Sequence, residues 1–196
     1  MIEFYNIVLF LHVMSFVFMS VPLFNLIVVN ERVLLGTNFN YYADRYMENI
    51  IRHGASRCFV FQTTVFVTGI LLLIIGGLGI EELWSSWVII AKVILLFTLM
   101  LMLSFIHFRL QPKIEEQMST LEPDSEIPEG FAARLKPFRV LRKQMATVCL
   151  FLVITIIILG MQVYSTFGLT VDIILIILAG LFSLHVSKSL IRFGWV

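Results

Sequence analysis

The chain has 196 residues, of which 59% are hydrophobic and only 14% are charged, and its formal net charge is +1. Soluble domains carry about 25% charged residues, so this composition indicates a membrane protein. The basic residues stand next to the hydrophobic stretches and form no separate basic domain. Nucleic acid is therefore not an expected partner.

Five hydrophobic stretches are long enough to cross a bilayer, which takes ~20 apolar residues. The first has no basic segment ahead of it and no small-residue cleavage site, so it is expected to be a retained helix. We therefore expect an all-α fold, an integral membrane helical bundle of five transmembrane helices in one domain over 1–196. Its spans are expected at about 4–29, 57–80, 84–110, 144–164 and 169–191.

Two polar segments separate the early spans from the later ones. Residues 30–56 place apolar side chains at three- and four-residue steps, which predicts an amphipathic helix lying at the membrane interface and leading into the second span across Gly54. Residues 111–143 contain the turn-rich stretch PDSEIPEG and then a basic amphipathic segment that Pro137 is expected to break.

The basic residues predict the orientation of the bundle. Apart from Lys92, they lie between spans one and two, between spans three and four, at the adjoining ends of those spans, or at the C-terminal end of the chain. The positive-inside rule then places the N-terminus outside and the C-terminus inside, in what we expect to be the inner (cytoplasmic) membrane of a bacterium. Anionic lipid is expected to meet the basic surface, at ~1 kcal/mol per residue. That surface includes Arg134, Lys136, Arg139, Arg142 and Lys143.

Two ionisable residues lie well inside hydrophobic stretches, His12 in the first and Lys92 in the third. The helical rise of ~1.5 Å per residue places both ~10–12 Å below the outer face. Such residues cost ~2.5–3.5 kcal/mol on insertion scales and normally face a protein interior, where they have a function. Lys92 therefore needs a carboxylate such as Asp172, a haem propionate, or a neutral amine.

Histidines inside spans are typical ligands of b-type haem, because a neutral imidazole nitrogen binds iron. His107 and His185 lie at similar depth towards the inner face, where they could be two axial ligands, and His53 lies beside them at the interface. His12 has no histidine at its own depth, so its partner could be Lys92, a methionine such as Met161, or nothing. The expected cofactor-binding residues are thus His12, Lys92, His107, His185 and His53, with His12, His107 and His185 as metal ligands.

Sulfur-containing residues offer an alternative cofactor. Thioether and imidazole groups suit cuprous ions, so copper is the alternative to haem b, with ligands among Met14, Met19, Met100, Met102 and Met161. Cys58 and Cys149 lie near the reducing side of the membrane and are expected to be small packing residues without a disulfide. Arg57, Gln62, Thr64, Thr68 and Gln162 are expected to form interhelical hydrogen bonds.

Short motifs occur in the first three spans. The first span opens with FYNIVLFLHVMSFVF, the second contains TTVFVTGILLL, and the third combines Trp87 and Lys92 with a closing Leu-Gln-Pro. Over about residues 5–116 these motifs resemble the copper-resistance D superfamily and its HemJ-type relatives. The resemblance implies a haem- or copper-handling bundle, with the family's helix-one histidine at His12 and its helix-three lysine at Lys92. HemJ-type proteins follow the first helix with a proline-arginine motif, where this chain reads VPLFNLIVVNE.

These observations lead to one expected function and three alternatives. We expect a haem b-binding membrane redox protein that passes electrons to or from quinone or a partner subunit. The alternatives are a HemJ-like protoporphyrinogen oxidase, a copper transporter, and a structural subunit of a membrane complex without a cofactor. The expected partners are the lipid bilayer, other subunits of a membrane complex and quinone. Whether the chain is an enzyme stays open.

Overall fold

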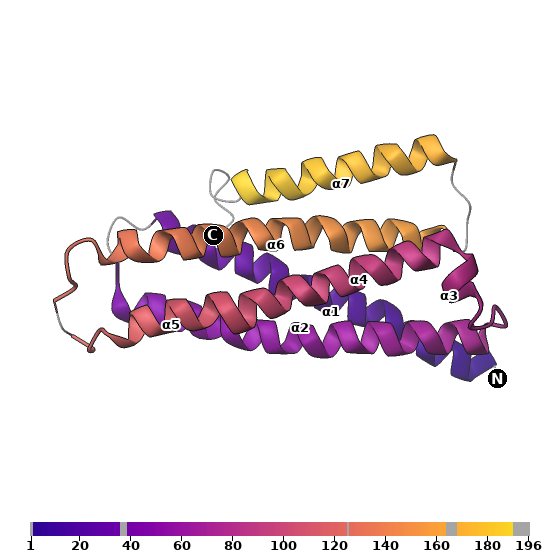
Figure 1. The fold of residues 1–196 in the computed structure, drawn as a ribbon, viewed down its shortest axis with the longest axis horizontal. Coiled ribbons are helices and arrows are strands. Elements are labelled where there is room, and N and C mark those ends of the chain that lie inside the picture. The colour runs from indigo at the N-terminus through magenta and orange to yellow at the C-terminus, as the bar shows by residue number, and fades with distance from the viewer. Residues whose placement is uncertain (1, 36–38, 125, 164–167, 190–196) are drawn as a thin grey trace.

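The computed structural model describes residues 2–35, 39–124, 126–163 and 168–189, and in these ranges the regular structure is helical. Figure 1 shows the helices lying side by side along one long axis. The elements are α1 (Ile2–Leu35), α2 (Tyr41–Ile75), α3 (Glu82–Ser85), α4 (Trp87–Phe105), the π-helical segment η1 (Ile106–Leu110), α5 (Gln111–Ser119), α6 (Phe131–Met161) and α7 (Leu169–Ser189).

Five helical segments are long and apolar enough to cross a membrane, which confirms the expected bundle of five spans. They cover Ile2–Ile27, Tyr41–Ile75, Trp87–Ser119, Phe131–Met161 and Leu169–Lys188. Large apolar side chains cover the outside of the bundle, for example Leu101, which is 71% exposed, and Leu181, which is 58% exposed. An apolar exterior over a packed interior is the arrangement that hydrocarbon requires.

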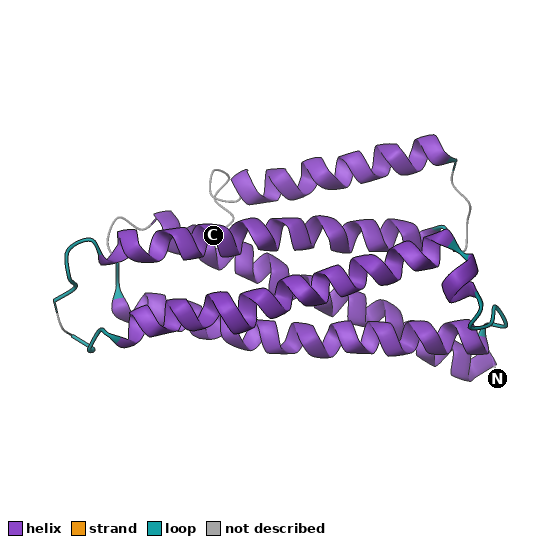
Figure 2. Ribbon diagram, in the orientation of Figure 1, coloured by secondary structure: helices purple, strands orange, loops and turns teal. Residues whose placement is uncertain are grey.

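Helix α6 lies at the centre of the arrangement. It packs against α1, α4 and α7, and α1 also packs along α2. Helix α7 lies at the edge of the bundle and has its main contact with α6 (Figure 1). The loops gather at two ends, shown in teal in Figure 2. We call these the α3 end, where the N-terminus of the chain also lies, and the α5 end.

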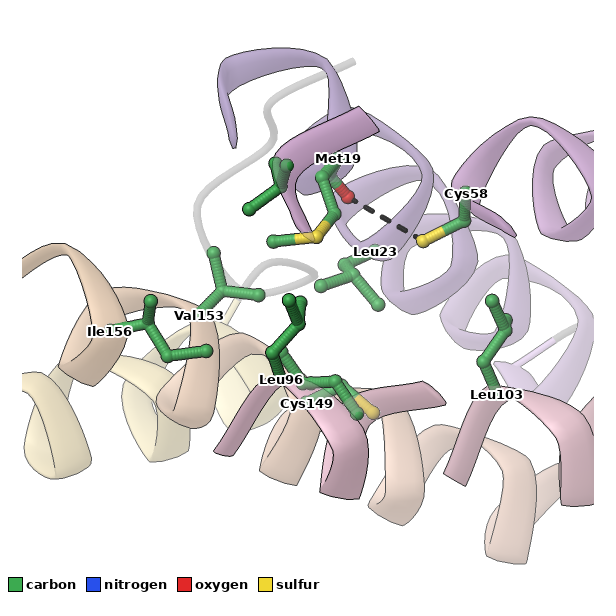
Figure 3. Packing of buried hydrophobic residues seen from close by; sticks show 10 residues of the cluster. Met19, Leu23, Cys58, Leu96, Leu103, Cys149, Val153 and Ile156 are labelled. Atoms are coloured by element: carbon green, nitrogen blue, oxygen red, sulfur yellow. Dashed lines mark hydrogen bonds between the residues drawn. The ribbon is translucent and has the colours of Figure 1, made fainter. Parts of the chain in front are cut away.

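The largest hydrophobic core cluster joins α1, α2, α4 and α6 in the middle of the bundle. Met19 and Leu99 are almost completely buried in it, and Cys58 and Cys149 are each 2% exposed (Figure 3). Both cysteines are free thiols. The expectation that they are small packing residues is therefore confirmed.

Helix α2 corrects the interpretation of residues 30–56. In place of a separate interfacial helix, the chain forms a continuous helix that begins at Tyr41 and passes through Gly54. Asn40 caps it, since its side chain accepts a bond from Ala43 N–H, at 3.0 Å, while Asp44 accepts one from Asn40 N–H, at 3.1 Å. This reciprocal capping stabilises the helix start. Likewise, Pro137 lies inside α6 and does not break it.

Four charged residues at the α5 end form a cluster that is buried within the protein. Glu48 of α2 makes a bidentate ion pair with Arg142 of α6, with its two oxygens 2.5 and 2.9 Å from the guanidinium nitrogens. Arg139, one turn earlier, donates to Glu48 at 3.2 Å and to Asp44 at 2.7 Å. Two carboxylates and two guanidiniums thus balance one another inside the protein, which is the arrangement that buried charge requires.

This cluster corrects the expectation that the basic residues at the start of α6 face lipid. Arg142 is completely buried and Arg139 is 4% exposed, so neither reaches the membrane surface. Arg134 and Lys136 are exposed, as expected for residues at a headgroup layer. The two faces of α6 differ because the arginines at positions 139 and 142 are one turn apart and point towards α2, where the carboxylates lie.

The π-helical turn η1 brings the third span into the same cluster. Gln111 N–H bonds to the carbonyl of Ile106, five residues earlier, and Pro112 follows with no N–H to donate. A widened turn accommodates the proline ring and places the successive residues Leu110 and Gln111 both in the interior. The Gln111 amide donates to Glu48 at 3.0 Å and accepts from Arg142 at 2.6 Å.

The first prediction concerns orientation, which follows from the basic residues at the α5 end. A single cysteine in place of Glu81, near the α3 end, should react with a membrane-impermeant maleimide added to intact cells. A cysteine in place of Glu126 should react only after the membrane is opened. Native Cys58 and Cys149 are buried and should contribute little background. The reverse labelling pattern would contradict the orientation.

The second prediction concerns the ion cluster. Glu48→Ala should lower the free energy of unfolding by about 3–5 kcal/mol, because it leaves two buried guanidiniums without their shared carboxylate. Loss of helical circular dichroism in a denaturant titration of the detergent-solubilised protein measures the change.

Two variants act as controls for this titration. Lys136→Ala removes an exposed charge on the same helix and should unfold like the wild type. Glu48→Leu combined with Arg142→Leu removes both charges of the bidentate pair and should recover part of the lost stability. If Glu48→Ala unfolds like Lys136→Ala, the cluster does not hold the bundle together.

Candidate functional site

His12 projects from α1 towards α2, where it meets Thr68. The imidazole Nδ1 lies 2.9 Å from the Thr68 hydroxyl oxygen. That hydroxyl donates its own proton to the carbonyl of Thr64, at 2.6 Å, so its oxygen accepts from Nδ1–H. In the neutral ring the lone pair is then on Nε2. Phe16 packs edge-on against the ring, with centroids 5.3 Å apart, and fixes its plane.

Lys92 of α4 lies close enough to His12 for their charges to interact. Its ε-amino group lies over the backbone of α6, because a β-carbon at Gly160 would be 3.7 Å from Nζ. Lys92 makes no hydrogen bond or ion pair with any residue in the described part of the chain. The structure thus brings His12 of α1 and Lys92 of α4 near each other within the bundle.

A glycine makes room for the imidazole. A β-carbon at Gly69 of α2 would lie only 3.3 Å from Cε1 of His12, tighter than nine in ten real contacts of this kind. At Gly160 of α6 a β-carbon would lie at ordinary contact distance from Nζ of Lys92, so this glycine marks where the amine approaches α6. We call the five residues from four helices the His12 cluster, which consists of His12, Thr68, Gly69, Lys92 and Gly160.

Asp172, which we considered as a partner for Lys92, has a different neighbour. The side-chain amide of Gln162, at the end of α6, donates to Oδ2 of Asp172 in the first turn of α7. Oδ1 is buried and has no hydrogen-bond partner among the described residues. The contact joins α6 to α7 at the α3 end and leaves the amine of Lys92 without a carboxylate from the described chain.

The remaining histidines do not gather into one site. His107 lies in η1 and packs against Phe59 of α2, with ring centroids 5.9 Å apart. His185 lies on α7, whose main packing partner in the described structure is α6 and not α2 or η1. His53 is exposed on α2, where its Nδ1–H donates to the carbonyl of Asn49 at 2.8 Å. Similar depth therefore does not make His107 and His185 facing ligands.

His107 nevertheless has an unusual environment. Its Nδ1 is buried and has no hydrogen-bond partner among the described residues. It also lies in a π-helical turn, a feature that often marks functional positions. The turn has a structural explanation in Pro112 and the ion cluster, so we assign His107 no role from this geometry.

Two of the candidate copper-binding methionines lie in the core of the bundle. Met19 is completely buried there, and Met102 lies with its sulfur 3.9 Å from that of Cys149. The part of the chain that the structure describes contains no group of three or more histidine, cysteine, aspartate or glutamate side chains that could hold a metal ion.

Two components of the His12 cluster were not predicted as such. Thr68 was expected only to form an interhelical hydrogen bond, and it does so with His12. This bond also fixes the tautomer of the His12 imidazole. Gly69 forms part of the threonine-glycine step of the second span, yet its contact with His12 depends on how α1 packs on α2. Sequence spacing along one helix cannot show that contact.

Comparison of the chain with protein-family models, with curated proteins and with solved structures finds no match. The site must therefore be interpreted from its own chemistry.

The third prediction concerns the tautomer of His12. Nitrogen-15 shifts of histidine-labelled protein should show His12 protonated at Nδ1 and bare at Nε2. Thr68→Val, which keeps the side-chain shape and removes the acceptor, should move the tautomer population towards Nε2–H. Thr64→Val is the matched control, since the Thr64 hydroxyl donates to Val60 and makes no bond to His12. An unchanged tautomer in Thr68→Val would show that Thr68 does not orient the ring.

Proposed function

We propose that the chain is a haem b-binding integral membrane redox protein in which His12 is an axial ligand of the iron. The observation that carries this proposal is the contact of His12 Nδ1 with the Thr68 hydroxyl, which itself donates to Thr64; with Nδ1 protonated, Nε2 would be the coordinating nitrogen. Metal-bound histidines almost always donate their other ring nitrogen to such a partner, which fixes the ring and raises its basicity.

Lys92 supports the proposal from a second helix. An ammonium group inside a span with no carboxylate among the described residues needs an anion, and a neutral amine there is free to bind a metal. A haem propionate would neutralise the ammonium form, and the iron itself would bind the neutral amine. Both arrangements use Lys92 near His12, where Gly69 leaves room for the imidazole.

The donor set fits a haem with one histidine ligand better than one with two. His107 and His185 lie on elements with no extensive mutual packing, and His53 is exposed on the outside of α2. When bound, haem iron would supply a reversible one-electron couple. The chain's own contribution is to hold the imidazole, exclude water with the apolar bundle and place a cation beside the ligand. The electron partner would be quinone or another subunit, which fits the apolar exterior of the bundle.

A second candidate function uses the same residues. The HemJ-like reaction oxidises protoporphyrinogen, which also carries carboxylates, and an unpaired Lys92 suits either ligand. Haem content alone cannot separate the two. Consumption of protoporphyrinogen by the purified wild type, abolished by Lys92→Met, would favour the enzyme over an electron carrier.

The fourth prediction tests the haem site. The pyridine haemochrome spectrum of the purified protein should show haem b, and His12→Ala should lose it. Thr68→Val should weaken haem affinity about 10–100-fold, because it removes the group that orients the ligand. Lys92→Met should change the spectrum if the lysine is a ligand, and mainly weaken haem retention if it is a counter-ion.

The inner histidines provide the controls. His107→Ala and His185→Ala should keep the haem content and the spectrum of the wild type. Full haem content with an unchanged spectrum in His12→Ala would overturn the assignment. Copper in stoichiometric amount without haem would favour the transport alternative, and neither cofactor would favour a structural subunit.

A further inference from the structure

A groove of about 430 Å³ lies between α1 and α2, in the half of the bundle towards the α5 end. Its two walls meet where Pro22 of α1 stands opposite Gly54 of α2, at 3.6 Å from Cβ of Pro22 to a β-carbon placed on the glycine. The groove opens on the outer surface of the bundle, next to exposed side chains. The lining includes Phe18, Val21, Asn25, Tyr46, Asn49, His53, Arg57 and Phe61.

The groove is apolar at one end and polar at the other. Phe18 and Phe61 stack with centroids 5.5 Å apart at the end nearer the His12 cluster. Asn25, Tyr46 and Asn49 lie towards the α5 end, because α1 and α2 run in opposite directions. A ligand in this groove would therefore lie with its apolar part along the phenylalanines and its polar part towards the loops.

Arg57 is the cation of the groove. It is exposed and makes no ion pair or hydrogen bond with any residue of the described chain. By helical rise it lies about 16 Å along α2 from Thr68, and so near the boundary between hydrocarbon and headgroups. His53 precedes it by four residues on the same face of the helix and is held by the Asn49 carbonyl.

An arginine at this depth needs an anion. Guanidinium groups bind phosphate through two parallel N–H bonds, and they are less costly at a headgroup layer than in hydrocarbon. The other arginines nearby, Arg139 and Arg142, have their charge balanced by Glu48 and Asp44. No carboxylate lines the groove, so the anion must come from outside the described chain.

We propose that this groove binds one anionic phospholipid, with its phosphate on Arg57 and an acyl chain along Phe18 and Phe61. The membrane itself supplies such a molecule, and the groove opens on the surface that the lipid reaches. The polarity gradient of the groove matches that of a phospholipid lying parallel to the helices. This site is separate from the His12 cluster and does not depend on the proposed redox function.

The test uses the full-length protein in nanodiscs made of equal parts phosphatidylglycerol and phosphatidylcholine. Native mass spectrometry after gentle release should find one phosphatidylglycerol retained in preference to phosphatidylcholine. Arg57→Gln should reduce this retention about fivefold, the effect of one basic residue near an anionic surface. Arg52→Gln is the matched control, because Arg52 is exposed on the same helix but does not line the groove.

Any one of the following results would overturn the proposal. Equal retention of the two lipids in the wild type would show that the headgroup charge is not recognised. Equal loss in Arg52→Gln and Arg57→Gln would show a general surface effect. Displacement of the lipid by excess inorganic phosphate would assign the site to a free anion, and an isoprenoid quinone retained in its place would assign it to that ligand. Helical circular dichroism of both variants confirms that they remain folded.

Discussion

The ion pair between Glu48 and Arg142 is the contact on which the register of the bundle depends. It joins α2 to α6, and Gln111 adds the third span through hydrogen bonds to both charged groups. Along each of the three helices, the distance from this ion cluster to the His12 cluster is ~27–30 Å, at ~1.5 Å per residue. The pairs of positions are Glu48 and Thr68, Arg142 and Gly160, and Gln111 and Lys92. A buried charge network at one end thus aligns the site residues near the other end, because helices that match in length between two sets of contacts cannot slide past one another.

The fold was predictable from hydropathy, because a bilayer forces each span to satisfy its own backbone and to show an apolar surface. The packing of the polar residues at the ends of the bundle was not predictable in this way. The sequence places Asp44 and Glu48 one turn apart on one helix and Arg139 and Arg142 one turn apart on another, a signal that points to pairing. It does not tell which face of each helix turns inward, so the same residues also suit an interfacial helix and a lipid-facing surface. Tertiary packing decides between these possibilities, and in the structure the four charged side chains are buried.

The candidate site shows the same limit. Residue counting placed His12 and Lys92 at the same level of two helices, since position along a straight helix follows from the rise alone. It could not give the direction in which a side chain points around the helix. For His12 and Lys92 the two directions converge, and Gly69 leaves room for the imidazole. For His107 and His185 they do not, because α7 packs on α6 while His107 turns to Phe59 of α2. Position along a helix, without direction around it, is therefore not enough to identify which residues face one another.

We propose that His12 is the single histidine bound to haem iron, and electron paramagnetic resonance tests this most directly. Protein with nitrogen-15 histidine in an otherwise nitrogen-14 chain should show, in the oxidised haem, hyperfine coupling from one axial imidazole. That coupling should be unchanged in His107→Ala and His185→Ala. Coupling from two equivalent imidazoles, or from none, would contradict the arrangement in which Thr68 holds His12 ready to coordinate and Lys92 stands beside it.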